Sequence, residues 1–86
     1  MSAIATPIEV AADQAELALT LAERGRHAEA IAMLWDALPV LERELGAYHP
    51  DVIAALESLA AIHERRGEHE QARVLFDTVA LRRVPS

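Results

Sequence analysis

Gly25-Arg26-His27-Ala28-Glu29-Ala30 returns further along the chain as Gly67-Glu68-His69-Glu70-Gln71-Ala72, a shift of 42 residues from position 25 to position 67. The same shift aligns residues 10–38 with residues 52–80. Identical residues then include the pairs Val10 and Val52, Leu17 and Leu59, Ala18 and Ala60, and Arg24 and Arg66. A fixed period of this length is typical of stacked structural repeats. The sequence therefore predicts two copies of one unit, packed side by side.

The first copy carries the start and stop signals of two helices. Thr6 can cap a helix that begins near Pro7, a residue suited to a first helical turn, and Gly25 ends that helix. Apolar residues at three- and four-residue steps then predict a second helix from about His27 to the stop at Gly46. Two antiparallel helices joined by a short turn are the expected result.

Pro39 lies inside the second predicted helix. Proline removes one backbone hydrogen bond and costs about 3 kcal/mol in a helix interior. We therefore expect either a kink near residues 35–39 or a break there, with the segment up to Leu45 helical again.

The second copy repeats the pattern of the first. Pro50 opens a helix that ends before Gly67, and a last helix runs from about His69 to Arg83, with Pro85 preventing its continuation. The fold class predicted is all-α, with four main helices in two stacked antiparallel hairpins. We expect one domain over residues 1–86, with repeat one at about 7–46 and repeat two at about 50–84.

Composition limits the classes of partner. The formal net charge of −6 at pH 7 opposes binding to nucleic acid or to an anionic membrane surface, because both require a basic patch. The expected partner is a basic or apolar protein or peptide. The chain has no cysteine, so packing alone must hold this small domain together.

No membrane segment or secretion signal is recognisable. No stretch reaches the roughly 20 apolar residues that a spanning helix needs. The start, Met1-Ser2-Ala3-Ile4-Ala5, lacks the basic region and long apolar run of a signal peptide. We expect a cytoplasmic location.

With the two copies aligned, the segment from Leu45 to Val52, the pair Leu59-Ala60 and the turn Gly67-Glu68-His69 resemble the tetratricopeptide repeat. The stretch Leu-Gly-Ala-Tyr-His-Pro-Asp-Val over residues 45–52 is similar to the 42-residue variety found in kinesin light chains. The resemblance covers nearly the whole chain. It implies small residues at helix contacts, glycines at turns and one large apolar residue between hairpins, here Ala18, Ala60, Ala30, Ala72, Gly25, Gly67, Leu34 and Phe76.

The resemblance also implies a binding surface. In this family, peptides bind the concave face made by the first helix of each hairpin, which here would present Glu16, Leu19, Glu23, Ser58, Ala61 and Arg65. Members that clamp a terminal carboxylate use lysine, arginine and asparagine there, and only Arg65 fits that set. The light-chain members have asparagine where this chain has Glu16 and Ser58, so their preference for acidic peptides is not carried over.

Catalytic and metal sites find no support. His63 and His69 lie six residues apart across a glycine, whereas the zinc-protease motif needs two histidines four residues apart on one helix. Ser58 lies on a helix without the glycine-flanked turn of a hydrolase nucleophile, and no glycine-rich phosphate loop precedes a helix. We expect no enzyme activity, no catalytic residues, no metal and no cofactor.

Two functions remain open. The favoured one is an adaptor or scaffold that binds a peptide or helix through the concave face. The alternative is a self-associating unit, a homodimer formed through exposed helix flanks, with Trp35, Phe76 and Leu81 as possible anchors. Trp35 fits equally well as a residue packed against the N-terminal segment or over Pro39. The chain could also be an excerpt of a longer repeat regulator.

Overall fold

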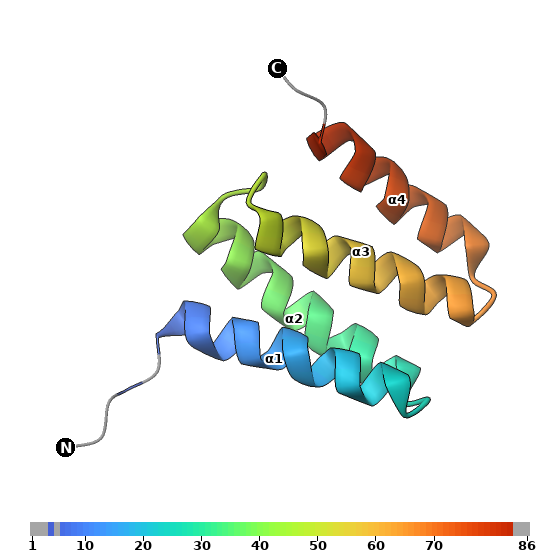
Figure 1. Cartoon of the computed structure of the whole chain (residues 1–86), viewed down its shortest axis with the longest axis horizontal. Coiled ribbons are helices and arrows are strands. Elements are labelled where there is room, and N and C mark those ends of the chain that lie inside the picture. Colours follow the sequence, from blue (N-terminus) through green and yellow to red (C-terminus); the bar gives the residue numbers. More distant parts are fainter. Residues whose placement is uncertain (1–3, 5, 84–86) are drawn as a thin grey trace.

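The structure in Figure 1 is a computed structural model, and it describes residue 4 and residues 6–83. The described chain forms the helices α1 (Pro7–Glu23), α2 (His27–Leu45), α3 (Pro50–Arg65) and α4 (His69–Arg83). None of its residues is in a strand. The all-α prediction is therefore confirmed, with helix bounds that agree to about a residue. Pro85, the expected stop, and the ends of the predicted domain range 1–86 lie outside the described residues.

The helices lie side by side in chain order, each antiparallel to the next (Figure 1). The pairs α1 with α2 and α3 with α4 make the most extensive contacts, and α2 against α3 joins the two hairpins. Within residues 6–83, α1 and α4 make no contact with each other and lie at opposite ends of the arrangement (Figure 1). Two stacked hairpins with two outer helices are the result.

Alanine allows the helices of each hairpin to approach closely. Ala18 and Ala30 in the first hairpin, and Ala60 and Ala72 in the second, have no exposed surface. A methyl side chain fills little of the space between two helix axes, so alanine at these positions lets the helix backbones approach closely. These four residues are the small contact residues that the sequence predicted.

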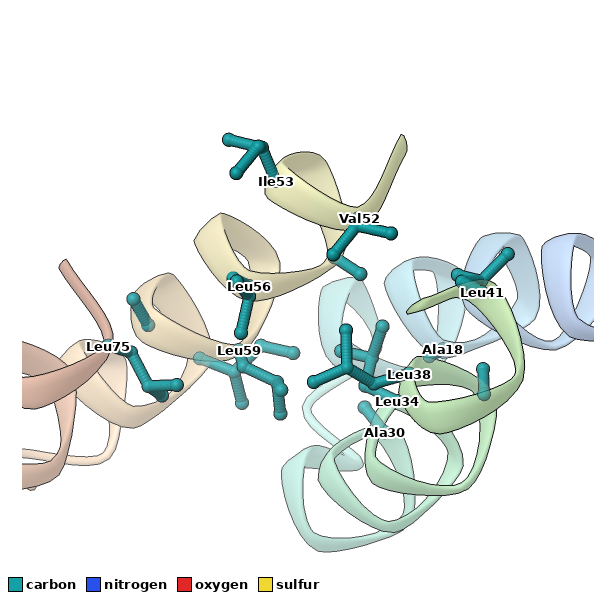
Figure 2. Packing of buried hydrophobic residues seen from close by; sticks show 14 of the residues in the cluster. Ala18, Ala30, Leu34, Leu38, Leu41, Val52, Ile53, Leu56, Leu59 and Leu75 are labelled. Atoms are coloured by element: carbon teal, nitrogen blue, oxygen red, sulfur yellow. The ribbon is translucent and has the colours of Figure 1, made fainter. Parts of the chain in front are cut away.

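Larger side chains fill the space between the hairpins. Figure 2 shows Leu34 and Leu38 of α2 projecting toward Leu59 of α3, with Val52 near Leu41 at the other end of the interface. All five are buried, and each leucine removed from water contributes about 1.5–3 kcal/mol. Every fully buried residue of the described chain is apolar.

The inward face of α1 is formed mainly by alanine. The residues Val10 and Leu17, which continue the apolar period of the helix, are about half exposed, whereas Ala11, Ala18 and Ala22 face α2 and are buried. Leu21 is also partly buried against the core. The first helix is therefore held mainly by a stripe of alanines, and Val10 and Leu17 lie outside that contact.

Pro39 does not break its helix. α2 is continuous from His27 to Leu45 through Pro39, so of the two expected outcomes the break is wrong, and the kink stays a prediction. Proline leaves the carbonyl of Trp35 without its usual donor four residues later. Both residues lie on the exposed side of α2, where water can bond that carbonyl.

Polar side chains cap two of the helices. The hydroxyl of Thr6 accepts a hydrogen bond from the N–H of Glu9 at 3.2 Å, as expected. The Nδ1 atom of His49 accepts one from the N–H of Asp51 at 3.1 Å, a cap that sequence reasoning missed. Each bond satisfies a backbone donor that a helix start leaves without a partner.

The two hairpin turns have the same backbone geometry. Gly25 and Gly67 have φ angles of 81° and 77°, a left-handed conformation that glycine adopts without strain. After each glycine, the next N–H donates back into the preceding helix, from Arg26 to the carbonyl of Leu21 at 2.9 Å and from Glu68 to that of His63 at 2.9 Å. This pattern closes a helix with a glycine cap.

The second turn also carries a side-chain network. One carboxylate oxygen of Glu68 lies 2.8 Å from Nδ1 of His63 and accepts a hydrogen bond from Nε of Arg66 at 2.8 Å. The hydrogen bond from His63, followed by the one from Arg66, holds the pKa of Glu68 below its ordinary value. The first turn has Leu21 in the place of His63, so the network belongs to the second hairpin alone.

Replacing the turn glycine tests the left-handed backbone. A Cβ added at Gly67 would meet no atom within 4 Å, so the cost of Gly67→Ala is conformational. We expect the free energy of unfolding to fall by about 1 kcal/mol, measured by urea denaturation followed by circular dichroism. Gly67→Asn should lose less, because asparagine tolerates this conformation better. Equal losses in the two variants would contradict the explanation.

Acid should weaken the network around Glu68. Because the pKa of Glu68 is lower in the folded chain, the unfolded state binds the proton more tightly. The stability that Glu68 contributes is therefore lost as the pH falls below the ordinary pKa of a glutamate. The free energy of unfolding of Glu68→Gln should therefore fall less between about pH 5 and about pH 3 than that of the parent. Asp77→Asn, an exposed carboxylate on α4, is the control and should leave the difference between the two pH values unchanged.

Candidate functional site

A groove runs between α1 and α3 on one face of the molecule. It consists of two adjoining depressions of about 250 Å³ and about 420 Å³, which share the residues Leu19, Ala54 and Ser58. The helices on either side are the first helices of the two hairpins. The groove therefore lies where one repeat stacks on the next.

Helix periodicity places the groove residues. Residues spaced three or four apart share one side of a helix, so each wall of the groove is one stripe. The stripe on α1 consists of Ala12, Glu16, Leu19 and Glu23, and the stripe on α3 consists of Asp51, Ala54, Ser58, Ala61 and Arg65. All six residues predicted for the concave face line the groove. Their part in binding stays a prediction.

Sequence reasoning missed several lining residues. Ala12 continues the α1 stripe by one turn toward the helix start, Ala54 and Asp51 continue the α3 stripe by two turns, and Glu57 borders the second depression. The signal that would have found the first three is the helical period itself, extended by one or two turns. Asp51 and Glu57 matter most, because they add charge to the site.

The groove is acidic. Four carboxylates line the two depressions: Glu16, Glu23, Asp51 and Glu57. Arg65 is the one basic side chain that lines either of them. Within residues 6–83, neither Glu16 nor Glu23 forms an ion pair, and Glu57 accepts a hydrogen bond from Arg83 at 2.8 Å. The excess of carboxylates gives the groove a negative potential that attracts cations.

The floor between the carboxylates is small and apolar. Leu19 is partly exposed there, and Ala54 and Ala61 are exposed on α3. The hydroxyl of Ser58 donates to the carbonyl of Ala54 at 2.9 Å, which leaves the oxygen free to accept a hydrogen bond. An apolar floor with acceptors at its edges suits a segment that presents aliphatic and cationic side chains.

The three possible interface anchors lie outside this groove. Trp35 on α2 and Phe76 and Leu81 on α4 are all exposed, and none lines either depression. Phe76 does not fill a gap between hairpins, because no hairpin follows α4 in the described chain. The role of all three as anchors stays a prediction.

The histidines that suggested a metal motif form separate pairs. His63 contacts Glu68, and Nδ1 of His69 lies 2.9 Å from a carboxylate oxygen of Glu64. In the part of the chain that the structure describes, no group of three histidine or carboxylate side chains is placed to hold a metal ion. The two pairs connect the end of α3 with the start of α4.

Comparison with known proteins agrees with the repeat geometry. The family model described as "Tetratricopeptide repeat" matches residues 10–79, which include parts of all four helices. No curated protein matches the chain as a relative. Among the described helices, none is long and apolar enough to cross a bilayer. The closer likeness to kinesin light chains stays a prediction. The match, the two aligned hairpins and their glycine turns together show that the chain belongs to the tetratricopeptide repeat family.

Proposed function

We propose that this chain is a non-catalytic protein–protein interaction module that binds a basic helix or peptide in the groove between α1 and α3. The observation that carries the proposal is the arrangement of four carboxylates around a small apolar floor. Family membership supports a protein partner. The module would act as an adaptor or scaffold.

The length of the groove sets the size of the ligand. The stripe from Asp51 to Arg65 is about 21 Å long, because 14 residues rise about 1.5 Å each along a helix. An extended peptide covers that length with about six residues, since each spans about 3.3–3.6 Å. A helical ligand needs about 14 residues, or four turns. The groove therefore suits a short linear motif or one partner helix.

The charge of the groove selects the chemistry of the ligand. Glu16 and Asp51 lie at one end, and Glu23 faces Arg65 at the other. Lysine or arginine side chains of the ligand would pair with these carboxylates, and small aliphatic side chains would contact Leu19. Nucleic acid and anionic membranes are disfavoured by the same negative potential. The proposal includes a cytoplasmic location, which suits a domain that holds together without cysteine.

Reversing two groove charges tests the site. The probe is a fluorescein-labelled helical peptide of lysine and leucine, and its affinity is measured by fluorescence anisotropy. We expect the double variant Glu16→Lys, Glu23→Lys to bind at least about tenfold more weakly, because two attractive charges become repulsive. Binding by the parent should also weaken as salt is raised.

A matched control separates the groove from net charge. Asp36→Lys, Glu44→Lys makes the same change in charge on α2, where neither residue lines the groove. This variant should keep most of the affinity of the parent. An equal loss in the two double variants would mean that the peptide responds to overall charge, and it would overturn the groove assignment.

A second function rests on a different observation. Trp35, Phe76 and Leu81 are large apolar residues that are about half exposed or more. Exposed residues of this kind often anchor interfaces. Self-association of the chain through its helix flanks, as a structural unit, is therefore the second candidate.

A further inference from the structure

The two repeats place equivalent residues in different surroundings. Val10 and Leu17 of α1 correspond by the 42-residue shift to Val52 and Leu59 of α3. In α1 they are 48% and 49% exposed, and in α3 both are 0% exposed. Val52 and Leu59 lie against α2 (Figure 2), so the preceding hairpin is what buries them. α1 thus has the same apolar face with no helix packed on it.

The outer face of α4 shows the same relation to α2. Phe76 corresponds to Leu34, which is 1% exposed against α3, yet Phe76 is 43% exposed. Ala80 and Arg83 correspond to the buried Leu38 and Leu41 and are likewise exposed. Phe76 and Ala80 therefore have no further hairpin packed on them in the described chain, and Arg83 contacts only its own hairpin, where it donates to Glu57 at 2.8 Å.

The two outer faces carry opposite charges. On α1, Asp13 takes the position of the buried Ala55. On α4, Arg73 takes the position of Ile31, and Arg83, which pairs with Glu57 of the same chain, takes that of Leu41. Pairing two α1 faces would bring carboxylates together, and pairing two α4 faces would bring arginines together. Only α1 against α4 joins opposite charges.

We infer that α4 of one copy docks on α1 of a second copy, in the register that α2 adopts on α3. Phe76 then contacts the partner's Leu17, as Leu34 contacts the region of Leu59 within one chain (Figure 2). Arg83 comes to lie beside the partner's Val10, one turn from the partner's Asp13, as Leu41 lies near Val52 (Figure 2). The inference rests on the second proposed function, self-association, and does not use the groove.

The geometry of this contact has a consequence for assembly. Each copy uses two different faces, so one contact leaves a free α1 at one end of the complex and a free α4 at the other. With such a heterologous contact, further copies add at the free faces until the assembly closes into a ring or forms an open array. A symmetric dimer, in contrast, would use one face twice and stop at two copies.

Two single variants and their mixture test the inference. Leu17→Glu places a carboxylate on the α1 face, and Phe76→Glu places one on the α4 face. Each residue is partly exposed, and circular dichroism checks that each variant keeps its helix content. Masses are measured by size exclusion with light scattering over a concentration series. The mass of the parent should rise with concentration above the 9.4 kDa of one chain.

Each single variant should associate more than about tenfold more weakly than the parent, because burying a carboxylate without a partner is strongly unfavourable. An equimolar mixture should form a complex of twice the chain mass and nothing larger. The intact α4 face of the Leu17→Glu chain meets the intact α1 face of the Phe76→Glu chain, and both remaining faces are blocked. No symmetric dimer predicts this restoration by mixing.

Two further variants complete the test. Val74→Glu is the control, because Val74 is 62% exposed on α4 and corresponds to Ala32, which is exposed on α2 and lies outside the core. It should associate like the parent. Asp13→Arg should weaken association, because it removes the negative charge of the α1 face and adds a positive one. It should leave folding unaffected, because Asp13 is exposed and is not part of the core.

The outcomes distinguish the inference from the broader proposals. A parent that stays monomeric at millimolar concentration overturns both self-association and the docking of α4 on α1, and leaves the groove proposal intact. A dimer that persists in either single variant overturns the head-to-tail contact and supports a symmetric one. Loss of association in Val74→Glu equal to that in Phe76→Glu also overturns it. Restoration by mixing, with Val74→Glu unchanged, supports it.

Discussion

The close approach of paired helices at alanine is the constraint on which the rest of the structure depends. Ala18 and Ala30 fix the first hairpin, and Ala60 and Ala72 fix the second in the same way. The two hairpins stack on each other, and their first helices border one groove. The groove between α1 and α3 is a product of that stacking. A larger residue at any of the four positions would push the helices apart and move one wall of the groove, although none of these alanines lines it.

Stability is distributed unevenly because the two inner helices have neighbours on both sides. α3 buries seven residues, including Leu59, Leu56 and Ile62, whereas α1 buries three alanines only. In a stacked array, each unit gains most of its stability from the adjacent interface. The free energy of local opening should therefore be lowest for the outer helices, α1 and α4. A partner on α1 or α4 would add the apolar contacts that those helices lack, and a ligand in the groove would tie α1 to α3.

Most of the fold could be predicted from the sequence because its signals are local. Glycine at Gly25 and Gly67, and proline at Pro7 and Pro50, mark helix ends through backbone constraints that no distant contact overrides here. The six predicted groove residues followed from the resemblance to the tetratricopeptide repeat, which implies a concave face on the first helix of each hairpin. The half exposure of Val10 and Leu17 could not be predicted from the apolar period, because it depends on whether a helix packs against that face of α1. The continuity of α2 at Pro39 depends on solvent access to one carbonyl, and the His49 cap and the Glu68 network depend on rotamers, none of which the sequence pattern specifies.

The repeat separates two kinds of surface that a single exposed apolar residue does not distinguish. At some positions both repeats expose the residue, as for Leu19 and Ala61 in the groove, and this exposure belongs to the repeat itself. At others one residue is exposed and its counterpart is buried, as for the exposed Leu17 and the buried Leu59, and the exposed residue lacks a neighbouring hairpin. The first kind is open to a ligand whether or not hairpins are added at the ends, and the second kind is covered by whatever hairpin comes next. Because the groove residues and the end faces lie on different sides of α1, extension of the stack would lengthen the groove and leave its existing wall accessible.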